Sequence, residues 1–320
     1  MKYSIKTMLL TTALLCGFSS CIKEDRSECN PGALLKFDYS LNPDYTNLFG
    51  DEVGKVTVYV FDENGLYYDR FSDAGKHLTN DWEMRLPLPP GNYTTVTWGG
   101  PLGTMYRIGE TNADETAFQS ELKKGVTHIS NFMLTAENNG QPLVELDDLY
   151  HGKADVTSVF QPTSEDAVTV DLMKNTKHLT VTVKDQRVGK NKADAASAPY
   201  EVYCTGANAR YLADNSFGKK AETITNRPYN TYTTPGNAVS ELDLMRLLIG
   251  RPFRLVVKNQ EGKTVFDKDL VETMQATGHY NTQEDFDREM RYDVVISMDG
   301  DTDITITING WEVVYIIPDL

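Results

Sequence analysis

The sequence predicts an all-β fold, with two β-sandwich domains in tandem behind a lipoprotein signal peptide. Three observations support this prediction. The first twenty residues have the composition of an export signal and end directly before a cysteine. Short runs of β-branched and aromatic residues, separated by Gly, Pro and Asn turns, then recur along the chain. The 320 residues also leave room for two domains of ordinary size once the signal is removed.

The N-terminus has the three parts of a bacterial lipoprotein signal, which we assign to residues 1–20. Lys2 and Lys6 precede an uncharged apolar run over 8–18, and two serines precede Cys21. The run is about half as long as the ~20 residues that a membrane-spanning helix needs. Cys16 is a poorer cleavage site because Leu15 precedes it, so we expect cleavage before Cys21 and acylation of this residue. An ordinary signal with an incidental Cys21 is the alternative.

A short tether, residues 21–33, follows the expected cleavage site. Lys23, Glu24 and Asp25 lie directly behind the cysteine. They resemble the acidic export tag that sends lipoproteins of Bacteroidota to the outer face of the outer membrane. The alternative is a polar spacer between lipid and protein. We therefore expect a lipid-anchored protein of the outer membrane that is exposed at the cell surface.

Residues 34–174 form the first predicted sandwich. Alternation over 34–41 indicates a strand, and Asn64-Gly65 between apolar runs indicates a tight hairpin. Residues 113–123 are expected to hold a short helix. The other strands are expected over residues 56–61, 66–68, 82–86, 93–98, 128–134 and 168–172.

Residues 175–320 form the second predicted sandwich. Residues 239–249 fit a strand or a helix, and we favour the strand. Thr282 and Asp285 resemble a capping box that opens one helical turn. The other strands are expected over residues 179–183, 200–204, 253–257, 264–266, 292–298, 304–308 and 311–317.

No motif for catalysis, metal binding or cofactor binding stands out. The net charge of −15 argues against a nucleic-acid partner, because phosphate contacts need clustered Lys and Arg. The five histidines lack metal-ligand spacing. The acidic stretch 299–303 resembles the start of a calcium loop, but Ile304 stands where that loop needs Gly. Trp82 and Trp98 fit a sandwich core better than a sugar platform. We therefore expect neither an enzyme nor a cofactor.

Only Cys29 and Cys204 remain after Cys21. In an oxidising compartment such a pair can form a disulfide. Two independent buried thiols are an equal alternative.

The order of several motifs resembles the fimbrillin-associated anchor family of Bacteroidota. They include Cys21 and Cys29, residues 58–65 (VYVFDENG), residues 86–93 (LPLPPGNY), Trp98-Gly99-Gly100, residues 148–152 (DLYHG), residues 245–247 (MRL) and residues 309–313 (NGWEV). The resemblance covers nearly the whole chain. It implies two transthyretin-like β-sandwich domains and a role as the lipid-anchored base, or minor subunit, of a surface fimbria. It also implies a fimbrial stalk subunit as partner, joined by strand complementation. The alternatives are a surface glycan-binding lipoprotein of a nutrient-uptake system and a tip adhesin.

Two segments bear on that role. Fibre subunits of this type lose their first strand to a surface protease that often cuts at Arg, whereas residues 41–54 contain neither Arg nor Lys. We therefore expect the first strand and its lipid to stay attached. Residues 311–317 are apolar on both faces apart from Glu312, which fits a central strand or a strand held by another protein equally well. The candidate partner-strand residues are Trp311, Val313, Val314, Tyr315, Ile316 and Ile317.

Overall fold

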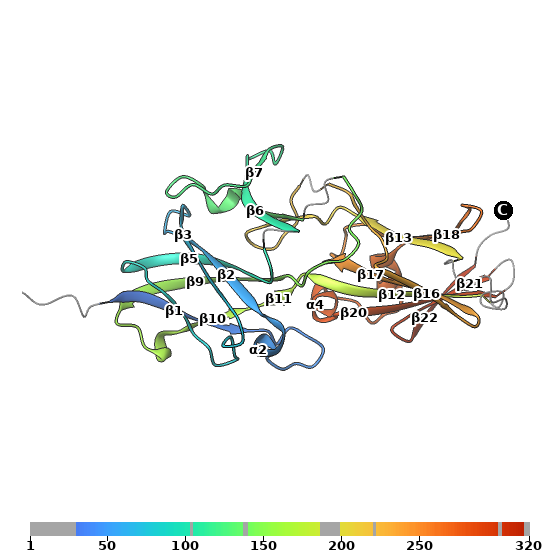
Figure 1. Cartoon of the computed structure of the whole chain (residues 1–320), viewed down its shortest axis with the longest axis horizontal. Coiled ribbons are helices and arrows are strands. Elements are labelled where there is room, and N and C mark those ends of the chain that lie inside the picture. The colour runs from blue at the N-terminus through green and yellow to red at the C-terminus, as the bar shows by residue number, and fades with distance from the viewer. Residues whose placement is uncertain are drawn as a thin grey trace, which may run out of the picture.

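The computed structural model describes residues 30–102, 105–136, 140–185, 199–219, 222–299 and 303–316. The predicted all-β class is confirmed, since strands in several sheets make up most of the described chain (Figure 1). The predicted signal peptide, with Cys21 and Cys29, lies outside the described residues. Within the described residues, no helix has the length and apolarity needed to cross a membrane.

The N-terminal half is a sandwich whose two layers meet along β1. This strand pairs in parallel with β10 and antiparallel with β4, and its first two residues pair with β9. The opposite layer has the order β9-β5-β2-β3, and β11 pairs with β9. The elements are β1 Pro31–Asp38, α2 Phe49–Glu52, β2 Lys55–Phe61, β3 Tyr67–Ala74, β4 Met84–Leu86, β5 Gly91–Gly99, β9 Tyr150–Phe160, the 3₁₀ turn η3 Ser164–Asp166, β10 Val168–Asp171 and β11 Met173–Lys174.

The predicted hairpin at Asn64-Gly65 is confirmed and joins β2 to β3. Gly65 has a φ of 74°, which Gly adopts at little cost. Inward-facing residues of both layers, such as Leu35, Phe37 and Val58, form one buried core. Trp82 stacks on Phe37 against this core, as the core interpretation predicts.

The C-terminal half is a second sandwich. Its larger sheet has the order β16-β17-β12-β20-β21-β22, and its smaller sheet has the order β15-β13-β18-β19. A buried cluster that includes Leu179, Leu255 and Ile306 fills the space between the sheets. The elements are β12 Thr176–Lys184, β13 Tyr200–Gly206, β15 Ile224–Asn226, β16 Asn230–Thr234, β17 Asn237–Met245, β18 Phe253–Asn259, β19 Thr264–Asp269, α3 Leu270–Ala276, α4 Gln283–Arg288, β20 Arg291–Asp299, β21 Asp303–Ile308 and β22 Trp311–Ile316.

Two local predictions in this half are confirmed. The favoured strand over 239–249 is present as β17, although it ends at Met245, and α4 begins with the expected capping box of Thr282 and Asp285. The sequence analysis missed α3, although Asp269 caps it by accepting a hydrogen bond from the Glu272 N–H. An acidic N-cap residue three positions before Glu was the available signal.

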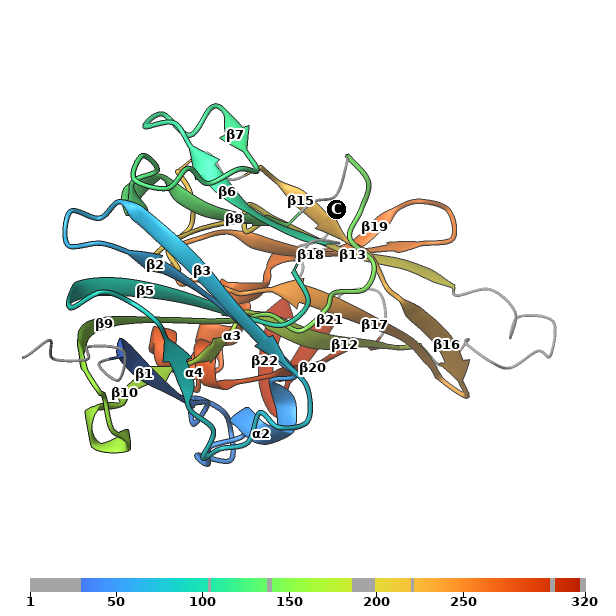
Figure 2. The same ribbon diagram turned by 60° about the vertical axis from the view of Figure 1, so that its left-hand side comes forward.

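A third layer joins the two halves. Strands β6 Tyr106–Thr111, β7 Phe118–Gln119 and β8 Phe132–Ala136 form a sheet with β14 Arg210–Leu212, so one strand of the C-terminal half completes a sheet of the N-terminal half. This layer lies over the β2-β3-β5-β9 sheet (Figure 2). A buried cluster with Trp98, Phe132 and Tyr211 fills the space below it. The 3₁₀ turn η2 Ile129–Asn131 precedes β8.

The short helix predicted over 113–123 is wrong. The Asn112 side chain accepts hydrogen bonds from the N–H groups of Thr116 and Ala117, which closes a turn. Glu115 has a φ of 55°, outside the helical region, and Phe118 pairs with β6. Side-chain capping of a turn outcompetes the helix here.

Candidate functional site

The C-terminal strand β22 is the last strand of the larger C-terminal sheet. It pairs antiparallel with β21 from Trp311, opposite Ile308, to Ile316, opposite Asp303. Within the part of the chain that the structure describes, no strand pairs with its other side. Such an edge presents a row of unpaired backbone N–H and C=O groups and is a template for another strand.

A tight turn fixes the start of β22. Asn309 and Gly310, at φ values of 47° and 86°, connect β21 to β22. The Asn309 side chain donates hydrogen bonds to the Tyr280 hydroxyl at 2.8 Å and to the Arg291 carbonyl at 3.1 Å. The Trp311 ring stacks on His279, with 3.5 Å between ring centroids. These contacts hold the turn and the first residue of β22 in place.

Five of the six predicted partner-strand residues therefore lie together on one edge strand. Trp311 is 48% exposed and Val313 is half-buried. Val314, Tyr315 and Ile316 belong to β22 by their backbone, whereas Ile317 lies outside the described residues. The strand lies at the end of its sheet rather than at its centre. Pairing of β22 with a strand of another protein remains a prediction.

The predicted cysteine pair remains untested, because Cys29 lies outside the described residues. Cys204 lies on β13 with its side chain fully buried in the C-terminal core. Burial raises the pKa of this thiol well above its usual value, so Cys204 is a poor nucleophile.

The chain passes from the first sandwich to the second through an extended, buried segment rather than a loose linker. The residues from Lys174 to Lys177 are buried although all four are polar. The Lys174 ammonium donates to Asp148 at 2.9 Å, and the Asn175 N–H donates to the Leu149 carbonyl at 2.6 Å. Both contacts fasten the start of this segment to the N-terminal half.

The next residues continue this network into the C-terminal half. The Lys177 ammonium is buried and donates to the backbone carbonyls of Asp287 and Glu289 at 2.7 and 2.6 Å. Burial lowers the pKa of Lys177 to about 7, mainly because desolvation disfavours its charge. His178 lies 2.6 Å from the buried carboxylate of Asp243. Sequence reasoning missed these contacts, because the partners lie 65 to 112 positions apart.

A buried ion pair lies beside this network. Arg246 donates two hydrogen bonds of 2.6 Å to the carboxylate of Asp287 and a third, of 3.0 Å, to the Asn215 carbonyl. Both charged side chains are less than 10% exposed. Asn215 and Asn175 exchange reciprocal amide hydrogen bonds. Arg246 belongs to the motif at residues 245–247 that contributed to the family resemblance. It is thus a buried cation at the junction.

The C-terminal half also holds the loop that follows β1. The Arg288 guanidinium donates to the carbonyls of Ser40 and Asn42 at 3.0 and 3.1 Å and lies 4.0 Å from the centre of the Tyr45 ring. The Tyr39 hydroxyl contacts the sulfur of Met290 at 3.1 Å. This loop would have to open for β1 to leave the sandwich. Arg288, at the end of α4, therefore holds it in place.

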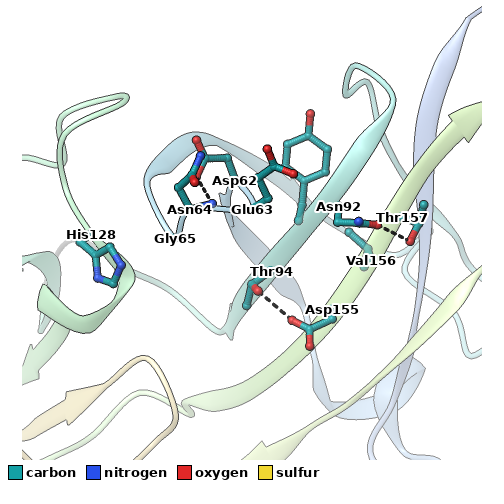
Figure 3. A pocket seen from close by; sticks show the side chains of 11 residues that line it. Asp62, Glu63, Asn64, Gly65, Asn92, Thr94, His128, Asp155, Val156 and Thr157 are labelled. Carbon is teal, nitrogen blue, oxygen red and sulfur yellow. Dashed lines mark hydrogen bonds between the residues drawn. The ribbon is translucent and has the colours of Figure 1, made fainter.

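A polar groove lies between the β2–β3 turn and the adjoining parts of β5 and β9 (Figure 3), with a volume of about 680 Å³. The Thr94 hydroxyl donates to Asp155 at 2.7 Å, and the Thr157 hydroxyl donates to the side-chain amide oxygen of Asn92 at 3.0 Å. The Tyr93 ring that lines the groove is largely buried, and Trp98 is fully buried elsewhere. The groove thus offers hydroxyl and carboxylate groups without an open aromatic platform.

The described residues contain no cluster of three or more His, Cys, Asp or Glu arranged to hold a metal ion. The centre of the acidic stretch 299–303 lies outside them. Gly262 and Lys263 lie in the turn that connects β18 to β19, and Thr264 begins β19. Gly262 has a φ of 76°.

The chain matches one protein family over most of its length and shares its fold with several solved structures. The profile of the family described as fimbrillin-A associated anchor proteins Mfa1 and Mfa2 matches residues 26–316. No curated protein shows significant similarity. A solved structure from Bacteroides thetaiotaomicron, of a protein proposed to bind polysaccharide, is 25% identical with a TM-score of 0.75 over 89% of this chain and 98% of that chain.

Two further structures share the fold. An adhesin candidate from Bacteroides thetaiotaomicron is 23% identical with a TM-score of 0.72 and covers 89% of this chain and 98% of its own. The fimbrial anchor protein Mfa2 from Porphyromonas gingivalis is 20% identical with a TM-score of 0.66 over 88% of this chain and 98% of its own. Since the family profile spans nearly all of the described residues, this chain belongs to the fimbrillin-A associated anchor proteins, a fimbria-associated family of the cell surface.

Proposed function

We propose that this protein is the lipid-anchored base, or a minor structural subunit, of a surface fimbria and attaches the fibre to the outer membrane. The placement of its two ends is the observation that carries the proposal. β1, which follows the tether, begins at one end of the long axis, and β22 lies in the half at the other end (Figure 1). A protein that connects a membrane to a fibre needs its two attachment points apart.

The lipid end rests on Cys21. Lipoprotein processing acts on the acylated cysteine, so Cys21→Ser should leave an unprocessed precursor without lipid. Fimbriae would then be shed or lost. The measurement is labelling of cells with a palmitate analogue, combined with counts of attached and released fibres; Cys16→Ser is the matched control and should change neither. If Cys21→Ser is still acylated and its fibres stay attached, the proposal is wrong.

We propose β22 as the place where the fibre is attached. In the proposal, a stalk subunit joins by strand complementation, with the open edge of β22 as the junction. The competing interpretation is that β22 is an ordinary strand of its own sandwich. In the proposed junction, hydrogen bonds between the two backbones would provide affinity, and the alternating side chains would provide specificity.

Deletion of residues 311–320 separates the two interpretations, with deletion of residues 317–320 as a control that keeps β22. A truncated protein that folds and reaches the surface but holds no fibre supports the junction. Because loss of β22 could unfold the sandwich, Val313→Lys is a second test. A charged residue blunts an edge strand without removing it. Retention of fibres by a folded Val313→Lys protein would contradict the junction at β22.

A second candidate function is binding of a surface glycan. The polar groove and the similarity to a protein proposed to bind polysaccharide favour it. The buried positions of Trp98 and Tyr93 weaken it, because they leave no ring face for a sugar. Glycan-array binding that is lost in Asp155→Ala, while fibres stay attached in Cys21→Ser, would favour this candidate over the anchor.

A further inference from the structure

Strands β10, β11 and β12 form one nearly continuous extended segment, Val168–Lys184, that runs from the first sandwich into the second (Figure 1). Only Leu172 and Asn175 interrupt the strand pairing. At one end, β10 pairs in parallel with β1, from Leu35 opposite Val168 to Asp38 opposite Asp171. At the other end, β12 pairs in parallel with β20 along residues 178–184.

These registers give the terminal strands a common direction. β1 and β10 are parallel, so both run toward the junction between the halves. β12 leaves the junction, and β20 runs with it. β21 is antiparallel to β20 and β22 is antiparallel to β21, so β22 also points away from the junction.

This direction decides how a pulling force meets the hydrogen bonds. A force on the tether pulls Pro31 backward along the axis of β1, and a force at the C-terminus pulls Ile316 forward along the axis of β22. Hydrogen bonds between strands lie across the strand axis. Both forces therefore shear whole sets of bonds at once instead of opening them one pair at a time.

The middle of the segment is held on both sides. Lys174, Asn175 and Thr176 contact the N-terminal half through Asp148 and Leu149. Lys177 contacts the end of α4. The segment can therefore pass load across the junction without sliding.

We propose that the protein bears tension along its long axis and that Val168–Lys184 is the member that carries the load, received from β1 by shear. The source of the force rests on the proposed anchoring function, whereas the mechanical property belongs to the folded chain alone. A fibre exposed to flow would pull along this axis.

Optical-tweezers measurements on the purified full-length chain test the proposal. Azide-bearing residues that couple to DNA handles replace Asn30 and Lys184 in the axial geometry, and Asn30 and Glu165 in the opening geometry. Both geometries load the same β1–β10 pair, because Glu165 lies just before β10 on an exposed turn. The axial geometry shears the pair, and the opening geometry unzips it. We expect a higher force for the first rupture in the axial geometry, and an equal or lower force would overturn the proposal.

A disulfide across the loaded pair tests the path itself. Lys36 and Thr169 are register partners and neither is buried, so Lys36→Cys with Thr169→Cys can bridge β1 to β10. Cys16→Ser, Cys21→Ser and Cys29→Ser remove competing thiols outside the buried core, and mass spectrometry verifies the bridge. The oxidised variant should lose the first rupture in the axial geometry. The control bridge, Thr205→Cys with Thr225→Cys between β13 and β15, lies off the path and should leave it unchanged.

An unchanged first rupture in the Lys36–Thr169 bridged protein, or the same effect from the control bridge, would refute the path. These measurements need neither lipid nor fibre. A failure here therefore leaves the anchor proposal standing, and shed fibres in Cys21→Ser do not depend on the rupture force.

Discussion

The buried pair of Arg246 and Asp287 predicts a sharp contrast between two substitutions. Arg246→Met removes the two 2.6 Å hydrogen bonds to Asp287 and leaves its carboxylate buried with the amide of Gln283, at 3.0 Å, as a remaining side-chain donor. Leaving a buried charge without its partner costs about 3–5 kcal/mol. We expect the free energy of unfolding to fall by about that amount.

The double variant Arg246→Met with Asp287→Leu should recover most of the loss, because two apolar side chains of similar volume can replace a buried ion pair at little net cost. The exposed pair of Arg254 and Asp267 is the matched control, since its side chains are 50% and 41% exposed. Arg254→Met should cost no more than about 1 kcal/mol.

Urea unfolding followed by Trp fluorescence gives the measurement, since buried Trp98 reports on the core shared by the two halves. The prediction fails if Arg246→Met lowers the free energy of unfolding no more than Arg254→Met does. It also fails if the double variant is less stable than Arg246→Met alone, because the carboxylate would then not be the source of the loss.

His151, Gly100 and the loop after β1 each give a further testable outcome. Burial lowers the pKa of His151 to about 4 from 6.5, so the unfolded chain binds more protons between these values and stability falls as pH drops through this window. Between pH 7 and 4.5 the wild type should lose roughly 2 kcal/mol more of its free energy of unfolding than His151→Phe. Equal slopes of stability against pH in the two proteins would exclude His151 as the cause. Gly100→Ala should lower the free energy of unfolding by about 2–4 kcal/mol, because Gly100 has a φ of +103° and the new Cβ would clash with the Asp148 carbonyl oxygen. The control Gly262→Ala, whose new Cβ would meet nothing within 4 Å, should cost only about 1–2 kcal/mol. Equal losses of stability by calorimetry would rule out the clash. N-terminal sequencing of the protein from intact cells should find no mature terminus within residues 42–55, and finding one would show that β1 is removed.

The sequence alone was sufficient for the fold class and for the tight turn at residues 64–65. Period-two alternation and Asn-Gly dipeptides act locally, so the hairpin at residues 64–65, the strand β17 and the cap of α4 followed from neighbouring residues. The ordered motifs also identified the family. The helix predicted over 113–123 failed for a local reason as well, because the Asn112 side chain closes a competing turn.

Only the tertiary structure decided which polar residues are buried together. Lys177, Arg246 and Asp287 carry ordinary charged side chains, and the three hydrogen-bonded pairs among them and Glu289 span 41 to 112 positions of sequence. Chain folding brings them into one low-dielectric junction, where each charge needs a partner. The edge position of β22 and the alignment of β10, β11 and β12 are likewise properties of sheet order, which strand patterns do not encode. The sequence thus determined which segments are strands, whereas long-range pairing decided which of them share the junction and which edge stays open.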